Sequence, residues 1–156
     1  MITPVLPVPY RSAASAGFWR KIVFVWLGLC ALVVVTGIKN IIDTRFPDPD
    51  DLLRLLQVRD WLAGQSWFDV HQYRMNPPAG APMHWSRLID PPIAFVILVL
   101  TPVLGQQLAE TAALVIVPLA TLGCAVALVA RFARRMFGEE IALLACLVLA
   151  LAVPVL

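Results

Sequence analysis

The chain has 156 residues, of which 60% are hydrophobic and 14% are charged, whereas soluble domains typically have about 45–50% apolar and about 25% charged residues. This composition excludes an ordinary soluble domain and indicates an integral membrane protein. The formal net charge is only +2, and there is no basic run with interleaved aromatic residues. We therefore expect membrane lipid as a partner and no nucleic acid.

Membrane-crossing helices are expected in three places. The first is residues 22–42, in which Lys39 is the single charged residue. The second is residues 111–130, whose 20 uncharged residues match the length that a bilayer crossing needs. The third is residues 141–156, which stay apolar to the last residue and suggest a truncated helix. These segments predict an all-α, multi-pass membrane protein.

Basic residues predict how these segments are oriented. The two basic groups are Arg11, Arg20 and Lys21 in residues 1–21, and Arg131, Arg134 and Arg135 in residues 131–140. Because cytoplasmic flanks are enriched in Lys and Arg, we expect both groups inside the cell. Residues 43–110 then form a long extracytoplasmic loop, and the chain is placed in the cell (inner) membrane with a cytoplasmic N-terminus.

The apolar segment 91–105, inside this loop, is expected to lie on the outer membrane surface. It has 15 uncharged residues, fewer than a crossing usually needs, and a further crossing would carry the second basic group outside. Pro91, Pro92 and Pro102 are expected to interrupt a continuous helix, which leaves a surface helix at about 93–104. A crossing through a thinned bilayer is the alternative.

A second surface helix is predicted at about 49–64. Asp48 suits a helix cap, the proline that follows suits the first helical position, and Asp50 lies at the positive end of the helix dipole. Gly64 provides the end. The exposed polar stripe of this helix is predicted to contain Asp50, Arg54, Gln57 and Trp61. Asp50 is either a helix-start acid or one ligand of a hard divalent cation, with the other ligands coming from elsewhere.

Residues 71–91 are rich in proline and are expected to form an irregular cover. Arg74 and Arg87 carry fork-shaped donors that suit phosphate. Trp85 can stack on a sugar or lie in the interfacial aromatic belt, and both interpretations stay open. His84 adds a polar group, for which a solvated or locally hydrogen-bonded state is the default. These four residues are the candidate substrate-binding groups.

The order of these features resembles the N-terminal part of C-type (GT-C) membrane glycosyltransferases, most closely the catalytic subunit of oligosaccharyltransferase. That pattern has a signal-anchor span, an Asp-initiated loop helix, a surface helix and a second span. Asp50, Arg59-Asp60 and Ala63-Gly64 follow the family motif, and the resemblance covers roughly residues 20–156.

The resemblance implies that Asp50 helps to hold Mg²⁺ or Mn²⁺ and that the donor is a sugar linked to a polyprenyl phosphate. Asp48, Arg59 and Asp60 are then structural, and no catalytic residue is assigned. The later acidic ligands, further spans and soluble domain of the family are missing from this sequence, so we expect an N-terminal portion of a larger GT-C fold, inactive alone. The alternative is a small non-catalytic subunit or assembly protein that packs against a larger membrane partner.

Overall fold

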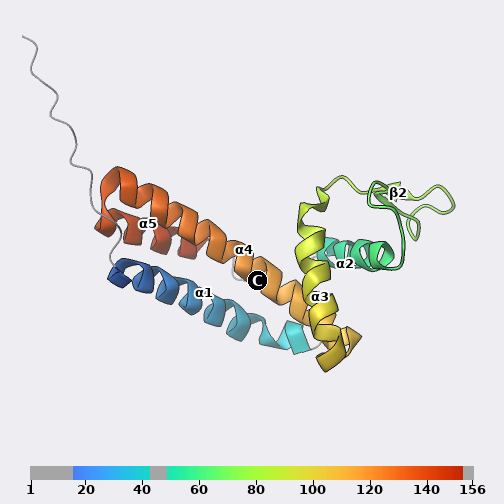
Figure 1. Cartoon of the computed structure of the whole chain (residues 1–156), viewed down its shortest axis with the longest axis horizontal. Helices are drawn as coiled ribbons and strands as arrows, with labels where there is room; N and C mark the ends of the chain where they lie inside the picture. Colours follow the sequence, from blue (N-terminus) through green and yellow to red (C-terminus); the bar gives the residue numbers. More distant parts are fainter. Residues whose placement is uncertain (1–15, 43–48, 153–156) are drawn as a thin grey trace, which may run out of the picture. The chain divides into compact units, whose positions relative to one another are not determined.

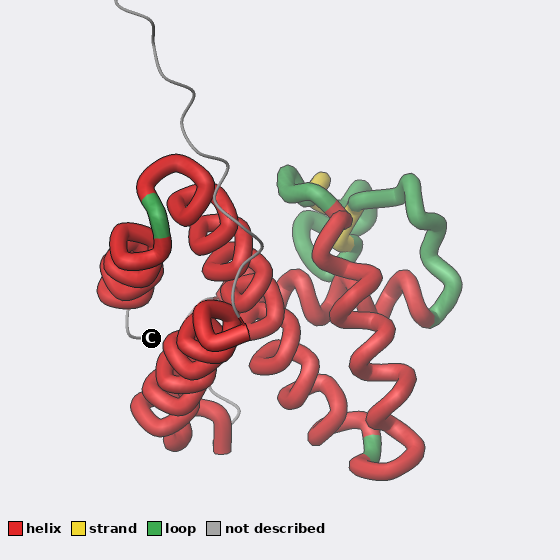
Figure 2. The backbone as a smooth tube through the Cα atoms, turned by 60° about the vertical axis from the view of Figure 1, so that its left-hand side comes forward, coloured by secondary structure: helices red, strands yellow, loops and turns green. Residues whose placement is uncertain are grey.

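The computed structural model of the chain describes residues 16–42 and 49–152, and the described part is mostly helical (Figures 1 and 2). Its helices are α1 (Ala16–Ile42), α2 (Pro49–Leu62), α3 (Asp90–Leu104), α4 (Gln106–Phe137) and α5 (Glu139–Ala152), with a short 3₁₀ helix η1 (Arg87–Ile89) before α3. Two short strands, β1 (His71–Gln72) and β2 (Ala81–Pro82), pair antiparallel. The expected all-α fold is confirmed apart from this small ladder.

Three described helices are long and apolar enough to cross a membrane. They are Gly17–Ile41, Arg87–Leu104 and Gln106–Phe137. The expected crossings at 22–42 and 111–130 lie almost entirely within the first and last of these. The expected third crossing lies in α5, whose 14 described residues are fewer than a bilayer crossing needs. Residues 153–156 lie outside the described part.

The expected helix at about 49–64 is present as α2. It begins at Pro49 and ends at Leu62. Gly64 follows with φ of 110° and donates its amide to the carbonyl of Trp61 at 3.0 Å. A positive φ costs glycine little, so Gly64 ends this helix as its sequence position predicts. Asp48, the expected cap, lies outside the described residues.

The expected helix at about 93–104 is present as α3, but it is continuous from Asp90 to Leu104, so the prediction that prolines interrupt the 91–105 segment is wrong. Pro91 and Pro92 occupy its first turn, where an amide hydrogen has no partner within the helix and is not missed. Pro102 lies in the last turn, and the Thr101 hydroxyl next to it donates to the carbonyl of Ile97 at 2.7 Å.

The cytoplasmic turn expected at 131–140 is much shorter in the structure. α4 continues to Phe137, and only Gly138, with φ of 96°, separates it from α5. The arginines of this segment favour a helix C-terminus because they lie near the negative end of its dipole. Arg134 also joins the two helices, since its Nε donates to Glu139 Oε1 at 3.1 Å.

The described chain forms two compact units. The first contains residues 16–33 of α1, residues 122–137 of α4, and α5. Its buried residues are Phe18, Ile22, Leu29, Val126, Ala130, Ala133, Ala142 and Cys146. Small residues let these helices approach closely: a Cβ atom at Gly123 would lie 2.9 Å from the indole of Trp26.

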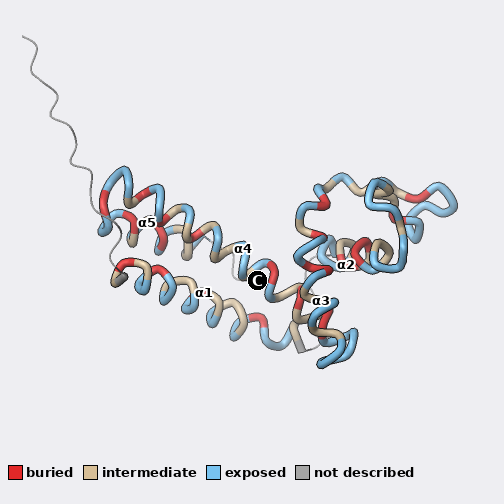
Figure 3. Tube along the Cα trace, viewed as in Figure 1, coloured by how far each residue is buried: buried red, intermediate tan, exposed pale blue. Residues whose placement is uncertain are grey.

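The second unit contains residues 34–42 and 49–121, and it holds all the polar elements described below. Its core joins α2, α3 and the beginning of α4. The buried residues are Leu55 and Val58 from α2, Ile93, Ala94 and Ile97 from α3, and Ala113 and Val117 from α4. The opposite face of α3 is exposed, so that buried and exposed residues alternate along the helix (Figure 3).

Candidate functional site

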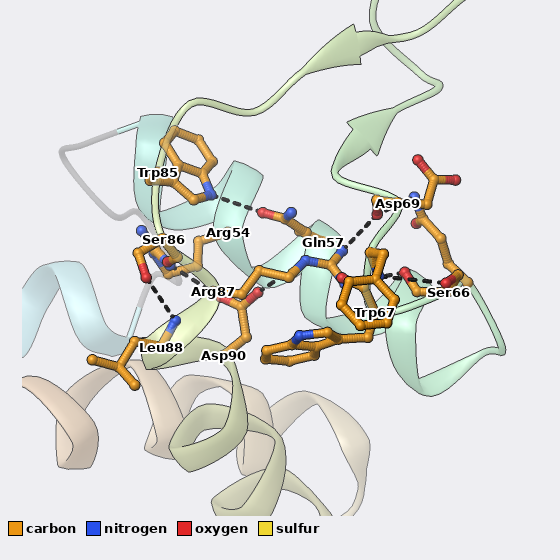
Figure 4. Close-up of polar contacts among 12 residues, drawn as sticks. Arg54, Gln57, Ser66, Trp67, Asp69, Trp85, Ser86, Arg87, Leu88 and Asp90 are labelled. Carbon is orange, nitrogen blue, oxygen red and sulfur yellow. Dashed lines mark hydrogen bonds and ion pairs between the residues drawn. The ribbon is translucent and has the colours of Figure 1, made fainter.

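Arg54 ties α2 to the beginning of α3 (Figure 4). Its Nη1 donates to Asp90 Oδ1 at 3.0 Å and to the carbonyl of Ser86 at 3.2 Å. The guanidinium lies over the ring of Trp85, 5.1 Å from its centroid. Asp90 is 1% exposed, and a buried carboxylate needs such a partner because burial without one is unfavourable.

Arg87 fastens the loop at residues 66–69 to the same place. Its Nη1 donates to the carbonyls of Trp67 at 2.6 Å and Ser66 at 3.2 Å, and its Nη2 donates to the carbonyl of Asp69 at 2.9 Å. Its Nε lies 3.7 Å from Asp90 Oδ2. The side chain is 6% exposed, so Arg87 supports the loop from inside, with its guanidinium directed at the loop carbonyls (Figure 4).

Gln57 was expected in the exposed polar stripe of α2, but it is buried in the structure, with an exposed fraction of 1%. Trp85 Nε1 donates to Gln57 Oε1 at 2.7 Å. An indole nitrogen only donates, so the amide oxygen of Gln57 must face it. The amide nitrogen is thereby turned inward, where it has no hydrogen-bond partner. Trp85 covers this stripe, which is why α2 presents fewer polar groups to solvent than its periodicity predicts.

Arg59 forms a second link, from α2 to the first turns of α4. Its Nε donates to Glu110 Oε1 at 2.7 Å, and its Nη2 donates to the other carboxylate oxygen. Gln106 Nε2 also donates to Glu110, at 3.0 Å. The hydrogen bond that Arg59 donates to Glu110 raises the pKa of Arg59, so Arg59 is charged at any ordinary pH.

Asp60, next along α2, holds the irregular cover. It accepts two hydrogen bonds from Arg74, at 2.5 and 2.9 Å, and one from Gln72 at 3.2 Å. The Arg74 hydrogen bonds lower the pKa of Asp60. Arg59 and Asp60, adjacent in sequence, thus bind different elements: Arg59 binds α4, and Asp60 binds the irregular cover.

Asp69 organises the beginning of the cover. Its Oδ1 accepts from the backbone amide of His71 at 3.1 Å and lies 3.0 Å from the Nδ1 of that residue, and its Oδ2 accepts from the Tyr73 hydroxyl at 3.0 Å. The His71 amide, followed by the His71 side chain, lowers the pKa of Asp69 to about 2. Gly80 has φ of 78° and lies against Tyr73 and His71, so a side chain there would be strained.

An open groove runs between α2 and the beginning of α4. Its volume is about 580 Å³, within the range of small-molecule sites. One wall is formed by leucines and the other is mainly polar. The lining residues are Leu52, Leu55, Leu56 and Leu114, together with Arg59, Gln106, Gln107, Glu110 and Thr111.

Asp50, the expected metal ligand, is exposed on the first turn of α2. Among the described residues, no three His, Cys, Asp or Glu side chains gather closely enough to hold a metal ion. Asp50 can therefore supply one carboxylate to a cation, and the residues described here do not complete its coordination.

The candidate substrate-binding residues are not brought into one open site. Arg74 is exposed but paired with Asp60. His84 is exposed, with its ring 5.1 Å from that of Trp85. Trp85 and Arg87 are bound within the folded loop. The sequence reasoning overlooked Asp90 and Glu110. Their signal was available, since they are the acids nearest to either end of the 91–105 segment.

Comparison of the chain with known protein families, curated proteins and solved structures finds no match.

Proposed function

We propose that this chain is part of a membrane glycosyltransferase that takes a sugar from a polyprenyl-phosphate-linked donor. The supporting observation is that α2 and residues 63–89, which we call the polar unit, are held against the apolar helices α3 and α4. Arg54 and Arg59 fasten α2 at two points, and Asp50 is exposed at its N-terminal end. A transferase with a lipid-linked substrate requires polar groups held rigidly beside the membrane, because alignment of the reacting groups lowers the barrier.

In this proposal Asp50 supplies one oxygen ligand to Mg²⁺ or Mn²⁺. Both are hard cations that prefer carboxylate oxygen. Among the described residues, no group of three His, Cys, Asp or Glu side chains could hold a metal ion, so further ligands would come from another part of the enzyme or from a partner chain. The cation would neutralise charge on the donor phosphates, and this chain alone would be inactive.

Arg74 and His84 are the candidate substrate contacts that remain accessible. A guanidinium binds phosphate oxygens in a planar fork. Trp85 and Arg87 then act indirectly, by holding the cover against α2. We place the polar unit outside the cytoplasm and the N-terminus inside, in the inner membrane, because this orientation leaves both basic groups cytoplasmic.

The experiment compares Asp50→Asn with Asp51→Asn in membranes that contain the full chain and its natural partners. Both acids lie on the first turn of α2, so the second variant controls for lost helix-dipole charge. Transfer of labelled sugar from a polyprenyl-phosphate donor is measured over a range of Mg²⁺ concentrations. We expect Asp50→Asn to need at least about tenfold more Mg²⁺ for half-maximal transfer, and Asp51→Asn to behave as wild type.

Unchanged transfer in Asp50→Asn would remove the metal role. If transfer in these membranes does not depend on this chain at all, the alternative of a non-catalytic multi-pass subunit or assembly protein takes its place. Exposed apolar side chains on α5, such as Leu144 and Val148, would then be surfaces for that larger partner.

A further inference from the structure

We propose that one end of the first unit binds the headgroup of a single anionic phospholipid. The site, which we name the basic end, consists of Arg20 and Lys21 from α1 and Arg131 and Arg135 from α4, all of which are exposed. Their sequence positions predict only the side of the membrane on which each pair lies, whereas the fold brings the two pairs together. Lipid binding there does not depend on the glycosyl transfer proposed above.

The antiparallel packing of α1 and α4 places the two pairs at the same end of the unit. The guanidinium of Arg134 lies over the ring of Phe18, 5.3 Å from its centroid. Eight residues further along α1, the indole of Trp26 lies against Gly123 of α4. Residue numbers rise along α1 where they fall along α4, so the two helices run in opposite directions. The beginning of α1 is therefore beside the end of α4.

The four cations also lie at nearly the same level. Measured from the two residues of the cation–π contact, Arg20 and Lys21 lie two and three residues further into α1. Arg131 lies three residues further into α4, and Arg135 lies one residue in the other direction. At about 1.5 Å per residue, all four fall within a layer of about 6 Å. Packed helices are about 8–10 Å apart, a separation that long Arg and Lys side chains can bridge to one headgroup.

The described part of the protein does not neutralise this charge. Of the residues that the structure describes, none forms an ion pair with any of the four cations. The acids of the described part of this unit are Glu139 and Glu140, at the beginning of α5. Glu139 is bound by Arg134, whose Nε donates to it at 3.1 Å. The basic end therefore has an excess of positive charge that suits an anion.

Exposed apolar residues continue each side of the basic end. Phe24 follows Arg20 by four residues, and Leu128 precedes Arg131 by three, so each shares a helix face with its cation. Phe24 is 66% exposed and Leu128 is 68% exposed. A phospholipid fits both parts of this surface, because its phosphate oxygens suit the guanidinium forks and its acyl chains suit the apolar faces. A soluble phosphate would leave the apolar faces uncovered.

Charge complementarity also indicates which lipid is bound. In the orientation proposed above, the basic end faces the cytoplasmic leaflet, whose anionic lipids favour each nearby Lys or Arg by about fivefold in affinity. A headgroup held by both pairs would join the beginning of α1 to the end of α4. A zwitterionic lipid offers the same acyl chains without the net charge and should bind more weakly.

The test counts bound lipids by native mass spectrometry of the full chain, in a neutral detergent with added phosphatidylglycerol or phosphatidylcholine. Two paired variants are compared with wild type: Arg20→Gln with Lys21→Gln, and Arg131→Gln with Arg135→Gln. Lys39→Gln is the matched control, because this exposed residue is on the same helix, about 27 Å beyond Lys21. Arg131→Lys with Arg135→Lys preserves the charge and separates lost charge from a damaged fold.

We expect one phosphatidylglycerol to bind more tightly than phosphatidylcholine, and each paired Gln variant to weaken that same lipid about 25-fold. Lys39→Gln should match wild type, and the paired Lys variant should keep most of the affinity. Soluble glycerol phosphate, which has the charge without acyl chains, should not compete.

Equal affinity for the two lipids would overturn the proposal. Two independent lipids, of which each paired Gln variant removes one, would show that the pairs do not form one site. An equal loss in Lys39→Gln, a paired Lys variant as weak as the paired Gln variant, or competition by glycerol phosphate would also overturn it.

Discussion

At the scale of single residues, the polar unit depends on side chains that bind backbone carbonyls or carboxylates from several elements at once. Arg87 donates to three carbonyls of the 66–69 loop and lies beside Asp90. Asp69 accepts from His71 and Tyr73. Hydrogen bonds of this kind contribute modestly when made, but leaving a buried partner unsatisfied costs considerably more.

Arg87→Lys tests this dependence while preserving the charge. A lysine ammonium cannot reproduce the planar fork that reaches three carbonyls. We expect a loss of about 1–3 kcal/mol in the free energy of unfolding, measured by thermal unfolding in detergent with tryptophan fluorescence as the readout. Arg74→Lys is the matched control, because that side chain is 57% exposed and exposed pairs contribute about 0–1 kcal/mol. Equal effects of the two substitutions would contradict a buried supporting role for Arg87.

The lowered pKa of Asp69 predicts how the stability of the irregular cover changes in acid. Its pKa falls from 3.8 to about 2 on folding, mainly through the His71 amide. A lowered carboxyl pKa stabilises the folded form fully above the unfolded value of 3.8, and this stabilisation is lost as the pH falls through about 2. The Asp69→Asn variant should lack this acid-dependent part of the stability. The measurement is the dependence of tryptophan fluorescence on pH between 7 and 2, and an identical curve in the variant would contradict the assignment.

At the scale of elements, the sequence predicted those features that depend on neighbours in the chain. The Pro49-Asp50 beginning and the Gly64 end of α2 follow from local capping rules, and both are present. The continuity of α3 was missed because prolines were counted as breakers without regard to their position in the first turn. This error concerns only the residues at the beginning of the helix and has a local cause.

Long-range contacts were beyond sequence reasoning. Gln57 belongs to a polar stripe by periodicity, and it is buried because Trp85, 28 residues away, covers it. The partnership of Arg59 with Glu110 joins residues 51 apart. Asp50 remains a candidate metal ligand only on the sequence pattern, since the described residues add no group of metal ligands around it.

The link between α2 and α4 is tested by exchanging its charges. Glu110→Arg places two guanidinium groups together and leaves Arg59 without its partner. Glu110 is 4% exposed and Arg59 is 44% exposed, so we expect an intermediate loss of about 1–3 kcal/mol. The double variant Arg59→Glu with Glu110→Arg should recover at least half of the loss in thermal unfolding. A double variant less stable than Glu110→Arg alone would refute direct pairing.

Packing in the first unit is tested at two glycines. Gly123→Ala places a Cβ atom 2.9 Å from the Trp26 indole, whereas a Cβ atom at Gly28 meets no atom within 4 Å. Overpacking costs typically 1–3 kcal/mol, so Gly123→Ala should lower the midpoint of thermal unfolding. Gly28→Ala is the control and should be neutral or slightly stabilising, because alanine favours a helix. The close approach of Trp26 would be disproved if both variants unfolded alike.

At the scale of the whole molecule, the open structural question is how often the chain crosses the membrane. Three helices of the described part are long and apolar enough to cross a membrane, but composition does not distinguish a crossing helix from one that lies in the interface. Arg54 binds Asp90 at the beginning of α3 and Arg59 binds Glu110 just after its end, so α2 reaches both acids from outside the hydrocarbon if α3 lies in the membrane plane. In the orientation proposed above, both basic groups lie in the cytoplasm and the polar unit lies outside.

Labelling of Gln107→Cys tests this most directly, because the residue is exposed at the beginning of α4, immediately after α3. In a chain without its native cysteines, carried in sealed right-side-out vesicles, a membrane-impermeant maleimide reports its side. Ala79→Cys marks the outside, and Ser12→Cys, which precedes α1, marks the inside whether or not α3 crosses. We predict that Gln107→Cys is labelled from outside as fast as Ala79→Cys. Labelling of Gln107→Cys only after permeabilisation, as for Ser12→Cys, would show that α3 crosses the bilayer and would contradict an in-plane α3.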